Sequence, residues 1–436
     1  MHARVGIVTA AVSAGSLVVT HFAVKDKLLD AQTLRVAGVA PYGGADIGEC
    51  RVTAKAVSGT DLTSWHAAWT STAVRVLALA ESEQAAGRLE SARLAFFRAS
   101  GYFRTAGVML MGVPLDPRLV ESYARQASAF RSAAMLLAEP PEIVEIPYER
   151  TGLPGYFFRA GPSSSPRPTV ILTGGYDGTA EELYFSNGAA ALARGYNVLA
   201  FDGPGQGAAL IQQGLVLRPD WEAVITPVVE YLLTRPDVDP ARIALIGLSL
   251  GGYLAPRAAS AEHRLAACIA DCGSYDLFDA AIQRIPRPLA GGLTQEQPVT
   301  SAVLRRVLKA LAGKPTAGWA LRRGQLVHGV ASPADYLLAL REYSLKEYAA
   351  QITCPVLVCD AEGDDISASA PQLAEALTCE KQYIHFTAAE GAGDHCEAGA
   401  RTLYHARSFG WLDNLLRPVP PPRSQPVASA PVPRMK

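Results

Sequence analysis

The spacing of apolar residues divides the chain into two parts. Between residues 61 and 138, large apolar side chains recur every three or four positions, as Trp65 and Trp69 illustrate. This period places them on one face of a helix. The two prolines at 140–141 stop the pattern, because proline cannot continue a helix. We therefore predict that residues 1–140 form a helical domain of several short antiparallel helices that caps the rest of the chain.

After the two prolines, short β-rich runs alternate with helical ones. The predicted strands are 142–148, 155–159, 169–173, 197–202, 243–247, 267–271, 356–360 and 381–386. Such alternation predicts a mostly parallel, eight-stranded sheet covered by helices. We assign this second domain to residues 141–416. A mostly helical insertion at 277–348 is expected to complete the cap, and the proline-rich tail at 417–436 is expected to be a disordered extension.

The overall charge argues against nucleic acid or a membrane surface as a partner. The 436 residues include 40 Lys and Arg and 41 Asp and Glu, a formal net charge of -1. A chain with so little net charge carries no field that would hold it on phosphate groups. We therefore expect a small molecule as its partner.

The cysteines and the N-terminus bear on the compartment. Seven cysteines are scattered along the chain without a CxxC pair. This pattern predicts reduced thiols in a cytoplasmic protein, without zinc. Residues 5–20 follow a basic start and are weakly apolar, so a poor signal peptide is the alternative; the run is too short and too polar to span a bilayer.

The strongest chemical signal lies where the fifth predicted strand ends. Gly247-Leu-Ser249-Leu-Gly251-Gly252 follows an apolar run and precedes a helical one. A sharp turn from strand to helix that exposes a serine needs glycine at these flanking positions, since side chains there would clash with neighbouring elements. Ser249 is therefore the predicted nucleophile.

A serine nucleophile needs a histidine to take its proton and a carboxylate to orient that histidine. His395 lies in a glycine-rich loop after the last predicted strand, where the ring can reach the serine. Asp364 follows the seventh strand, in the position expected for the acid, and Asp365 is the alternative.

Attack on a carbonyl also needs hydrogen-bond donors for the oxyanion. The backbone N–H of Leu250 is one predicted donor. We expect the second in the glycine-rich turn after the third strand, from Tyr176 by position or from Gly175.

Further motifs extend across the chain, and together they resemble one family. These are residues 32–35, 43–49 and 65–69, the run Asp-Gly-Pro-Gly-Gln-Gly at 202–207, the serine turn, and Glu-Gly-Ala-Gly-Asp-His-Cys at 390–396. The chain resembles the α/β-hydrolases that include 2,6-dihydroxypseudooxynicotine hydrolase and the fungal polyketide-shortening hydrolases of naphthopyrone pigment formation. That resemblance implies an α/β-hydrolase fold whose helical domain covers the site, a homodimer and no cofactor.

The resemblance also implies hydrolysis of a carbon–carbon bond next to a carbonyl, in a β-diketone, a polyketide or an acylated aromatic ring. The pyridine-ring hydrolase uses an extra acidic residue downstream of its nucleophile. Asp271, Asp276 and Asp279 all follow the sixth strand, and Asp276 is our preference for that role.

Two other functions remain open from the sequence. A carboxylesterase or thioesterase would share the same three residues and differ in the leaving group. A ligand-binding protein without activity is the alternative from another class, since fold alone does not fix function. The presence of Ser249, Asp364 and His395 together favours an enzyme.

Overall fold

The computed structural model describes residues 21–161, 165–286, 290, 293 and 298–416. The weakly apolar N-terminal run and the proline-rich tail lie outside the described residues, so both predictions stay untested. No described helix is long and apolar enough to cross a membrane.

Eight strands form one sheet in the order β1-β2-β4-β3-β5-β6-β7-β8. Their bounds are β1 Glu142–Tyr148, β2 Thr151–Phe158, β3 Arg167–Thr173, β4 Asn197–Phe201, β5 Val238–Leu248, β6 Ala267–Asp271, β7 Val356–Ala361 and β8 Lys381–Phe386. β2 is antiparallel to both of its neighbours, and the remaining pairs are parallel. The predicted α/β-hydrolase fold is confirmed, including every predicted strand.

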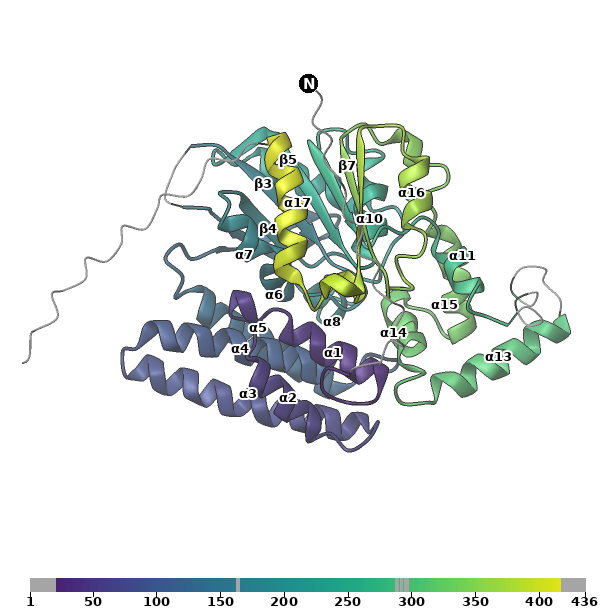
Figure 1. The fold of residues 1–436 in the computed structure, drawn as a ribbon, viewed down its shortest axis with the longest axis horizontal. Helices are drawn as coiled ribbons and strands as arrows, with labels where there is room; N and C mark the ends of the chain where they lie inside the picture. Colours follow the sequence, from purple (N-terminus) through teal and green to yellow (C-terminus); the bar gives the residue numbers. More distant parts are fainter. Residues whose placement is uncertain (1–20, 162–164, 287–289, 291–292, 294–297, 417–436) are drawn as a thin grey trace, which may run out of the picture.

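Helices cover this sheet and follow its parallel strands. They are α6 Ala180–Leu183, a π-helical turn Tyr184–Gly188, α7 Ala189–Leu192, α8 Gly207–Ile211, α9 Glu222–Leu233, α10 Gly251–Ala259, α16 Ala370–Ala376 and α17 Arg401–Leu416. α9 and α10 pack against each other, and α17 crosses the front of the sheet in Figure 1. Strands β3 to β7 are buried along nearly their whole length, as expected for a sheet covered on both faces.

Residues before the sheet form helices, which lie together below it in Figure 1. Their bounds are α1 Lys27–Ala37, α2 Ile47–Lys55, α3 Leu62–Ala85, α4 Leu89–Val108 and α5 Pro117–Ala134. α3 has 24 residues and α4 has 20, so the helices are longer than the short ones expected. Pro117 begins α5 rather than ending a helix, because the first turn needs no N–H donor.

The insertion between β6 and β7 is also mostly helical where it is described. It contains α11 Leu277–Ile282, α13 Pro298–Ala312, α14 Trp319–His328 and α15 Pro333–Ala339. Trp319 joins the insertion to the N-terminal helices, because its indole N–H donates to the carbonyl of Val108 at 3.0 Å. Both helical regions therefore meet at the same side of the sheet.

Candidate active site

Ser249 occupies the tight turn between β5 and α10. Its φ of +64° lies in the left-handed region that favours glycine. A Cβ atom at Gly247 would lie 1.9 Å from the carbonyl oxygen of Gly251, and one at Gly252 would lie 2.0 Å from that of Cys272. Glycine is therefore required at both positions, and the turn between them lifts the serine hydroxyl away from the sheet.

A continuous chain of hydrogen bonds runs from Ser249 through His395 to Asp364. The hydroxyl oxygen of Ser249 is 2.9 Å from Nε2 of His395, and Nδ1 of the same ring is 2.8 Å from Oδ2 of Asp364. With its proton on Nδ1, the ring donates to the carboxylate and accepts from the serine. The structure thus brings together the three side chains predicted from the order of the strands.

Asp364 is held in place by further donors. Its Oδ1 accepts the backbone N–H of Ile366 at 3.0 Å, and its Oδ2 accepts the Cys272 thiol at 2.9 Å. Burial would raise the pKa of Asp364. The charge of His395 and the hydrogen bonds to the carboxylate outweigh burial and hold that pKa below its ordinary value. Asp365 is exposed, and its backbone carbonyl accepts a hydrogen bond from Arg284 at 2.6 Å. The geometry therefore favours Asp364 over Asp365.

Gly175, in the turn after β3, lies directly against the serine. A Cβ atom there would be 2.8 Å from the hydroxyl oxygen of Ser249 and 2.9 Å from the backbone nitrogen of Leu250. Only glycine leaves this space open for a substrate oxygen. The phenol of Tyr176 contacts the insertion, with its oxygen 3.0 Å from Nε2 of His328. The backbone N–H groups of Leu250, Gly175 and Tyr176 remain predicted oxyanion donors.

The next residue, Asp177, is surrounded by three arginines from different elements. Arg35 of α1 is 3.1 Å from Oδ2 of Asp177 and also binds Glu182 with two hydrogen bonds of 2.7 Å. Arg104 of α4 is 3.4 Å from Oδ2, and Arg323 of α14 is 3.5 Å from Oδ1. Burial opposes the charge of Asp177, but these arginines more than offset it and lower its pKa. The N-terminal helices and the insertion are thus both joined to the loop beside Ser249.

The Asp-Gly-Pro-Gly-Gln-Gly run supports the same loop from the sheet side. Oδ1 of Asp202 accepts the backbone N–H of Ala180 at 2.7 Å, and Oδ2 accepts the hydroxyl of Tyr123 from α5 at 3.1 Å. The side-chain amide of Gln206 donates to the carbonyl of Gly174 at 2.8 Å. The motif is visible in the sequence, but its supporting role depends on contacts between distant elements.

A cavity of about 90 Å³ lies between α1 and the sheet beside the serine. Its lining includes Ser249 and His395 from the sheet side and Gln32 and Arg35 from α1. The hydroxyl therefore faces a space that the first described helix helps to enclose.

Asp276, the preferred auxiliary acid, has other contacts. It caps α11, where its Oδ1 accepts the backbone N–H of Asp279 at 2.7 Å. Its Oδ2 is 3.1 Å from the ammonium nitrogen of Lys346. It lines a separate hollow of about 500 Å³ whose described lining contains none of the three residues of the hydrogen-bonded chain. This placement gives Asp276 a role at a helix end.

Two other carboxyl groups lie behind His395. Asp271 at the end of β6 and Glu397 are completely buried. Among the described residues, none forms a hydrogen bond to the carboxylate oxygens of either group. Burial is the largest cause that raises both pKa values, that of Asp271 to about 8. The guanidinium of Arg401 lies 3.9 Å from Oδ2 of Asp271.

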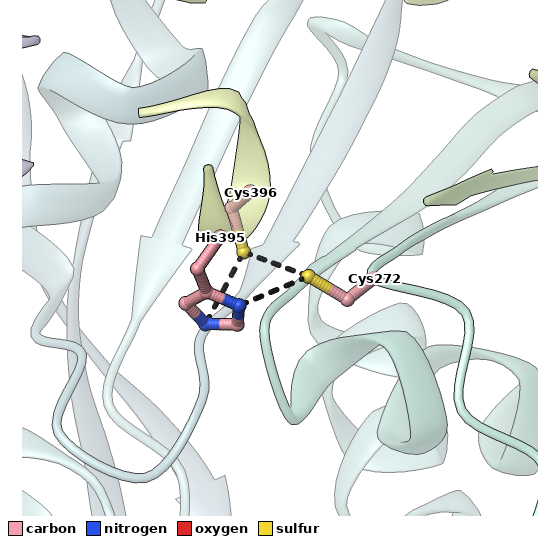
Figure 2. A group of neighbouring side chains, drawn as sticks. All are labelled: Cys272, His395 and Cys396. Carbon is pink, nitrogen blue, oxygen red and sulfur yellow. Dashed lines mark hydrogen bonds between the residues drawn. The ribbon is translucent and has the colours of Figure 1, made fainter. Parts of the chain in front are cut away.

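Cys272 and Cys396 complete the surroundings of the histidine (Figure 2). Sulfur and nitrogen ligand atoms of Cys272, His395 and Cys396 lie within 4.8 Å of one another, which is the geometry of a possible metal site and the only such group among the described residues. Both ring nitrogens of His395 are already bonded to Ser249 and Asp364. Metal binding through the ring would therefore break the chain of hydrogen bonds. The sequence showed no CxxC signal for this group, because its members meet only in the fold.

The family follows from comparison with known proteins. Residues 169–403, more than half of the chain, match the model described as "Alpha/beta hydrolase family". Residues 54–279 match the one described as "Esterase FrsA-like". The chain belongs to the α/β-hydrolase family and is an enzyme.

Individual relatives extend the likeness to the helical region. "Hydrolase LUC6" of Fusarium sp is 37% identical, with 87% of this chain and 94% of the relative covered. "20-hydroxy-prefusarin hydrolase FUS2" of Gibberella moniliformis is also 37% identical, with the same coverage of 87% and 94%. The crystal structure of 2,6-dihydroxy-pseudo-oxynicotine hydrolase has a TM-score of 0.70 and 23% identity, covering 88% of this chain and 97% of that one. That structure shows the same fold, as the resemblance seen in the sequence implied.

Proposed function

We propose that this enzyme is a serine hydrolase that cleaves a carbon–carbon bond next to a carbonyl, in a β-diketone, a polyketide or an acylated aromatic ring. The observation that carries the proposal is the hydrogen-bonded chain from Ser249 through His395 to Asp364, beside a cavity. A serine that is aligned in this way is activated for attack on a carbonyl carbon.

The first half of the reaction forms an acyl-enzyme. Oγ of Ser249 bonds to the carbonyl carbon while Nε2 of His395, 2.9 Å away, takes the hydroxyl proton. Asp364 stabilises the imidazolium through its 2.8 Å contact with Nδ1. The new oxyanion occupies the space beside Gly175 and the backbone nitrogen of Leu250, which a side chain would fill.

Collapse of this intermediate breaks the bond to the leaving group. In a β-diketone, the electron pair passes to the carbon between the two carbonyls, where the second carbonyl stabilises it as an enolate. His395 returns the proton to that carbon. Water, deprotonated by the same ring, then hydrolyses the ester on Ser249 and restores the enzyme.

The names of the relatives support a defined organic substrate. FUS2 is named for 20-hydroxy-prefusarin, and the superimposed structure is a hydrolase of 2,6-dihydroxy-pseudo-oxynicotine. We therefore propose that the substrate of this enzyme is a small organic molecule similar in size to the compounds in these two names. The match to the FrsA-like esterase description makes an oxygen-ester or thioester substrate the second candidate.

The N-terminal helices serve as a cap in this proposal. The cavity at Ser249 has about 90 Å³, whereas sites that bury a drug-sized ligand have about 300–1,000 Å³. A bulky substrate therefore needs α1 to move away from the sheet, and its return separates the bound substrate from bulk solvent.

A substrate panel with matched serine variants tests the proposal. We expect the purified enzyme to hydrolyse aryl β-diketones faster than aryl esters or thioesters of the same size, and a fluorophosphonate to label Ser249. Ser249→Ala should abolish turnover and labelling. Ser186→Ala is the control, since Ser186 lines the same cavity but only donates to the carbonyl of Glu182 at 3.0 Å.

Other outcomes assign other functions. Faster ester or thioester hydrolysis would replace the carbon–carbon substrate with the second candidate. Turnover that survives Ser249→Ala would refute the serine mechanism. Tight binding of a diketone without any turnover or labelling would point to a ligand-binding role.

A further inference from the structure

The thiol groups of Cys272 and Cys396 are in direct contact next to the proposed catalytic base. Their sulfur atoms are 3.1 Å apart. Cys272 directly follows β6, and Cys396 directly follows His395, so the contact joins two loops that are far apart in the sequence (Figure 2). The ring of His395 lies between them and the serine, with Nδ1 3.4 Å from the sulfur of Cys272.

The two cysteines differ in access to the cavity. Both are buried, but Cys396 lines the cavity beside Ser249, while Cys272 is not among the described residues that line it. Peroxide that enters this cavity therefore reaches the sulfur of Cys396 before that of Cys272. The thiolate is the form of a cysteine that attacks peroxide.

We propose that Cys396 and Cys272 form a site of reversible oxidation by hydrogen peroxide, with Cys396 as the attacked thiol and Cys272 as the resolving thiol. The Cys396 thiolate bonds to one peroxide oxygen, the O–O bond breaks, and the departing hydroxide becomes water on taking a proton. The sulfur of Cys272 then bonds to that of Cys396 and displaces hydroxide, which leaves as a second water with the Cys272 proton. Two thiols lose two electrons, and one peroxide gains them.

This disulfide would disturb the hydrogen-bonded chain at two of its members, Asp364 and His395. The sulfur atoms have to approach from 3.1 Å to about 2.05 Å. Cys272 then no longer donates to Oδ2 of Asp364, a hydrogen bond that is 2.9 Å long in the reduced protein. Cys396 is bonded to His395 along the backbone and has a φ of +50°, so a shift of its sulfur also displaces the ring. The oxidised enzyme is therefore slow or inactive.

Mass spectrometry of the full-length protein tests the disulfide directly. The reduced enzyme is desalted into buffer with EDTA, so that no metal ion occupies the thiols, and is treated with hydrogen peroxide. We expect the loss of two hydrogens in mass and a peptide pair linked through Cys272 and Cys396. Dithiothreitol should reverse both. The expected fall in turnover is about tenfold or more, below the roughly 10⁴-fold loss seen when the orienting carboxylate of a triad is removed.

Two variants separate this site from general thiol oxidation. In Cys272→Ser, oxidation should stop at a sulfenic acid on Cys396 that dimedone captures. Cys379→Ser is the matched control, since Cys379 is more exposed than either member of the pair and its loss should leave the disulfide unchanged. Peroxide treatment that yields no linked 272–396 peptide from the wild-type protein, or that modifies Cys379 instead, would overturn the inference.

The mass readout needs no substrate. The effect on turnover rests on the proposed function, whereas the disulfide does not. A linked peptide in a protein that hydrolyses nothing in the panel would refute the proposed function and leave the oxidation site standing.

Discussion

Arg35 and Asp177 are separated by 142 positions in the sequence, yet the guanidinium of one lies 3.1 Å from the carboxylate of the other. The first belongs to α1 and the second to the loop that carries Gly175 past Ser249. A movement of the N-terminal helices is thereby passed to the loop that shapes the oxyanion space. The contact therefore joins the helical region to the hydrolase sheet beside the nucleophile.

Asp177→Asn should destabilise the protein and also slow the reaction. The change leaves Arg35, Arg104 and Arg323 around a buried side chain that carries no charge, and removal of one partner of a buried ion pair costs about 3–5 kcal/mol. Urea unfolding measures the first effect, and kcat measures the second. Asp239→Asn is the control, because its partner Arg242 lies three positions away at a more exposed site, where such pairs contribute about 0–1 kcal/mol. Equal losses in the two variants would contradict the linking role of Asp177.

Asp364→Asn and Asp365→Asn should differ by orders of magnitude in activity. Only Asp364 reaches Nδ1 of His395, at 2.8 Å. Loss of an orienting carboxylate lowers kcat by about 10⁴ because the ring takes the wrong tautomer. Asp365 is exposed, and its variant should keep nearly full activity. Steady-state kinetics of both folded variants decide the matter, and a larger loss at Asp365 would move the acid there.

Gly175→Ala should abolish turnover while the protein stays folded. The added methyl would be 2.8 Å from the hydroxyl oxygen of Ser249, in the space that the substrate oxygen needs. Removal of a single oxyanion donor costs about 10²–10³ in rate, and a blocked space should cost at least as much. Gly410→Ala, in α17, meets nothing within 4 Å and is the control. Activity within a few-fold of wild type in Gly175→Ala would place the oxyanion elsewhere.

The pH dependence should reveal the charge around His395. Burial lowers the pKa of the ring, but Cys396 and Asp364 outweigh it and raise that pKa well above its ordinary value of 6.5. Only the neutral ring accepts the serine proton, so kcat/KM should fall as the pH decreases through this raised pKa. The fall should therefore begin above pH 6.5.

Cys396→Ser removes one of the negative charges that raise this pKa. The acidic limb of the pH profile should then move to lower pH, toward the ordinary histidine value. Profiles of kcat/KM for both proteins provide the measurement. An unchanged limb, or one that moves to higher pH, would show that Cys396 does not carry this charge.

Local signals explain why much of the site was predictable. Ser249 needs glycines on both sides because backbone atoms occupy the space around the turn, and that requirement is visible in the sequence. His395 was identifiable because it alone follows the last strand in a glycine-rich loop. Asp364 and Asp365 are adjacent carboxylates, and only the path of the loop, fixed by contacts such as the N–H of Ile366, separates them.

Contacts between distant elements could not be predicted. Nothing near Arg104 or Arg323 in the sequence indicates that both approach Asp177. Cys272 and Cys396 meet only because β6 ends beside the histidine loop. Its position after β6 favours Asp276 as an auxiliary acid, but local capping and Lys346 decide where its carboxylate lies. Such pairings depend on the register of the whole fold.

The distribution of the site along the chain has a consequence for protein synthesis. Helices α3, α4 and α5 contact one another in sequence order, and such local contacts form quickly as the chain leaves the ribosome. Ser249 follows these helices, but His395 emerges 146 positions after Ser249, and α17 comes later still. A growing chain can therefore build its helical bundle and most of its sheet without a working base opposite the serine. Hydrolytic activity begins only after the loop that carries His395 has left the ribosome and reached Ser249.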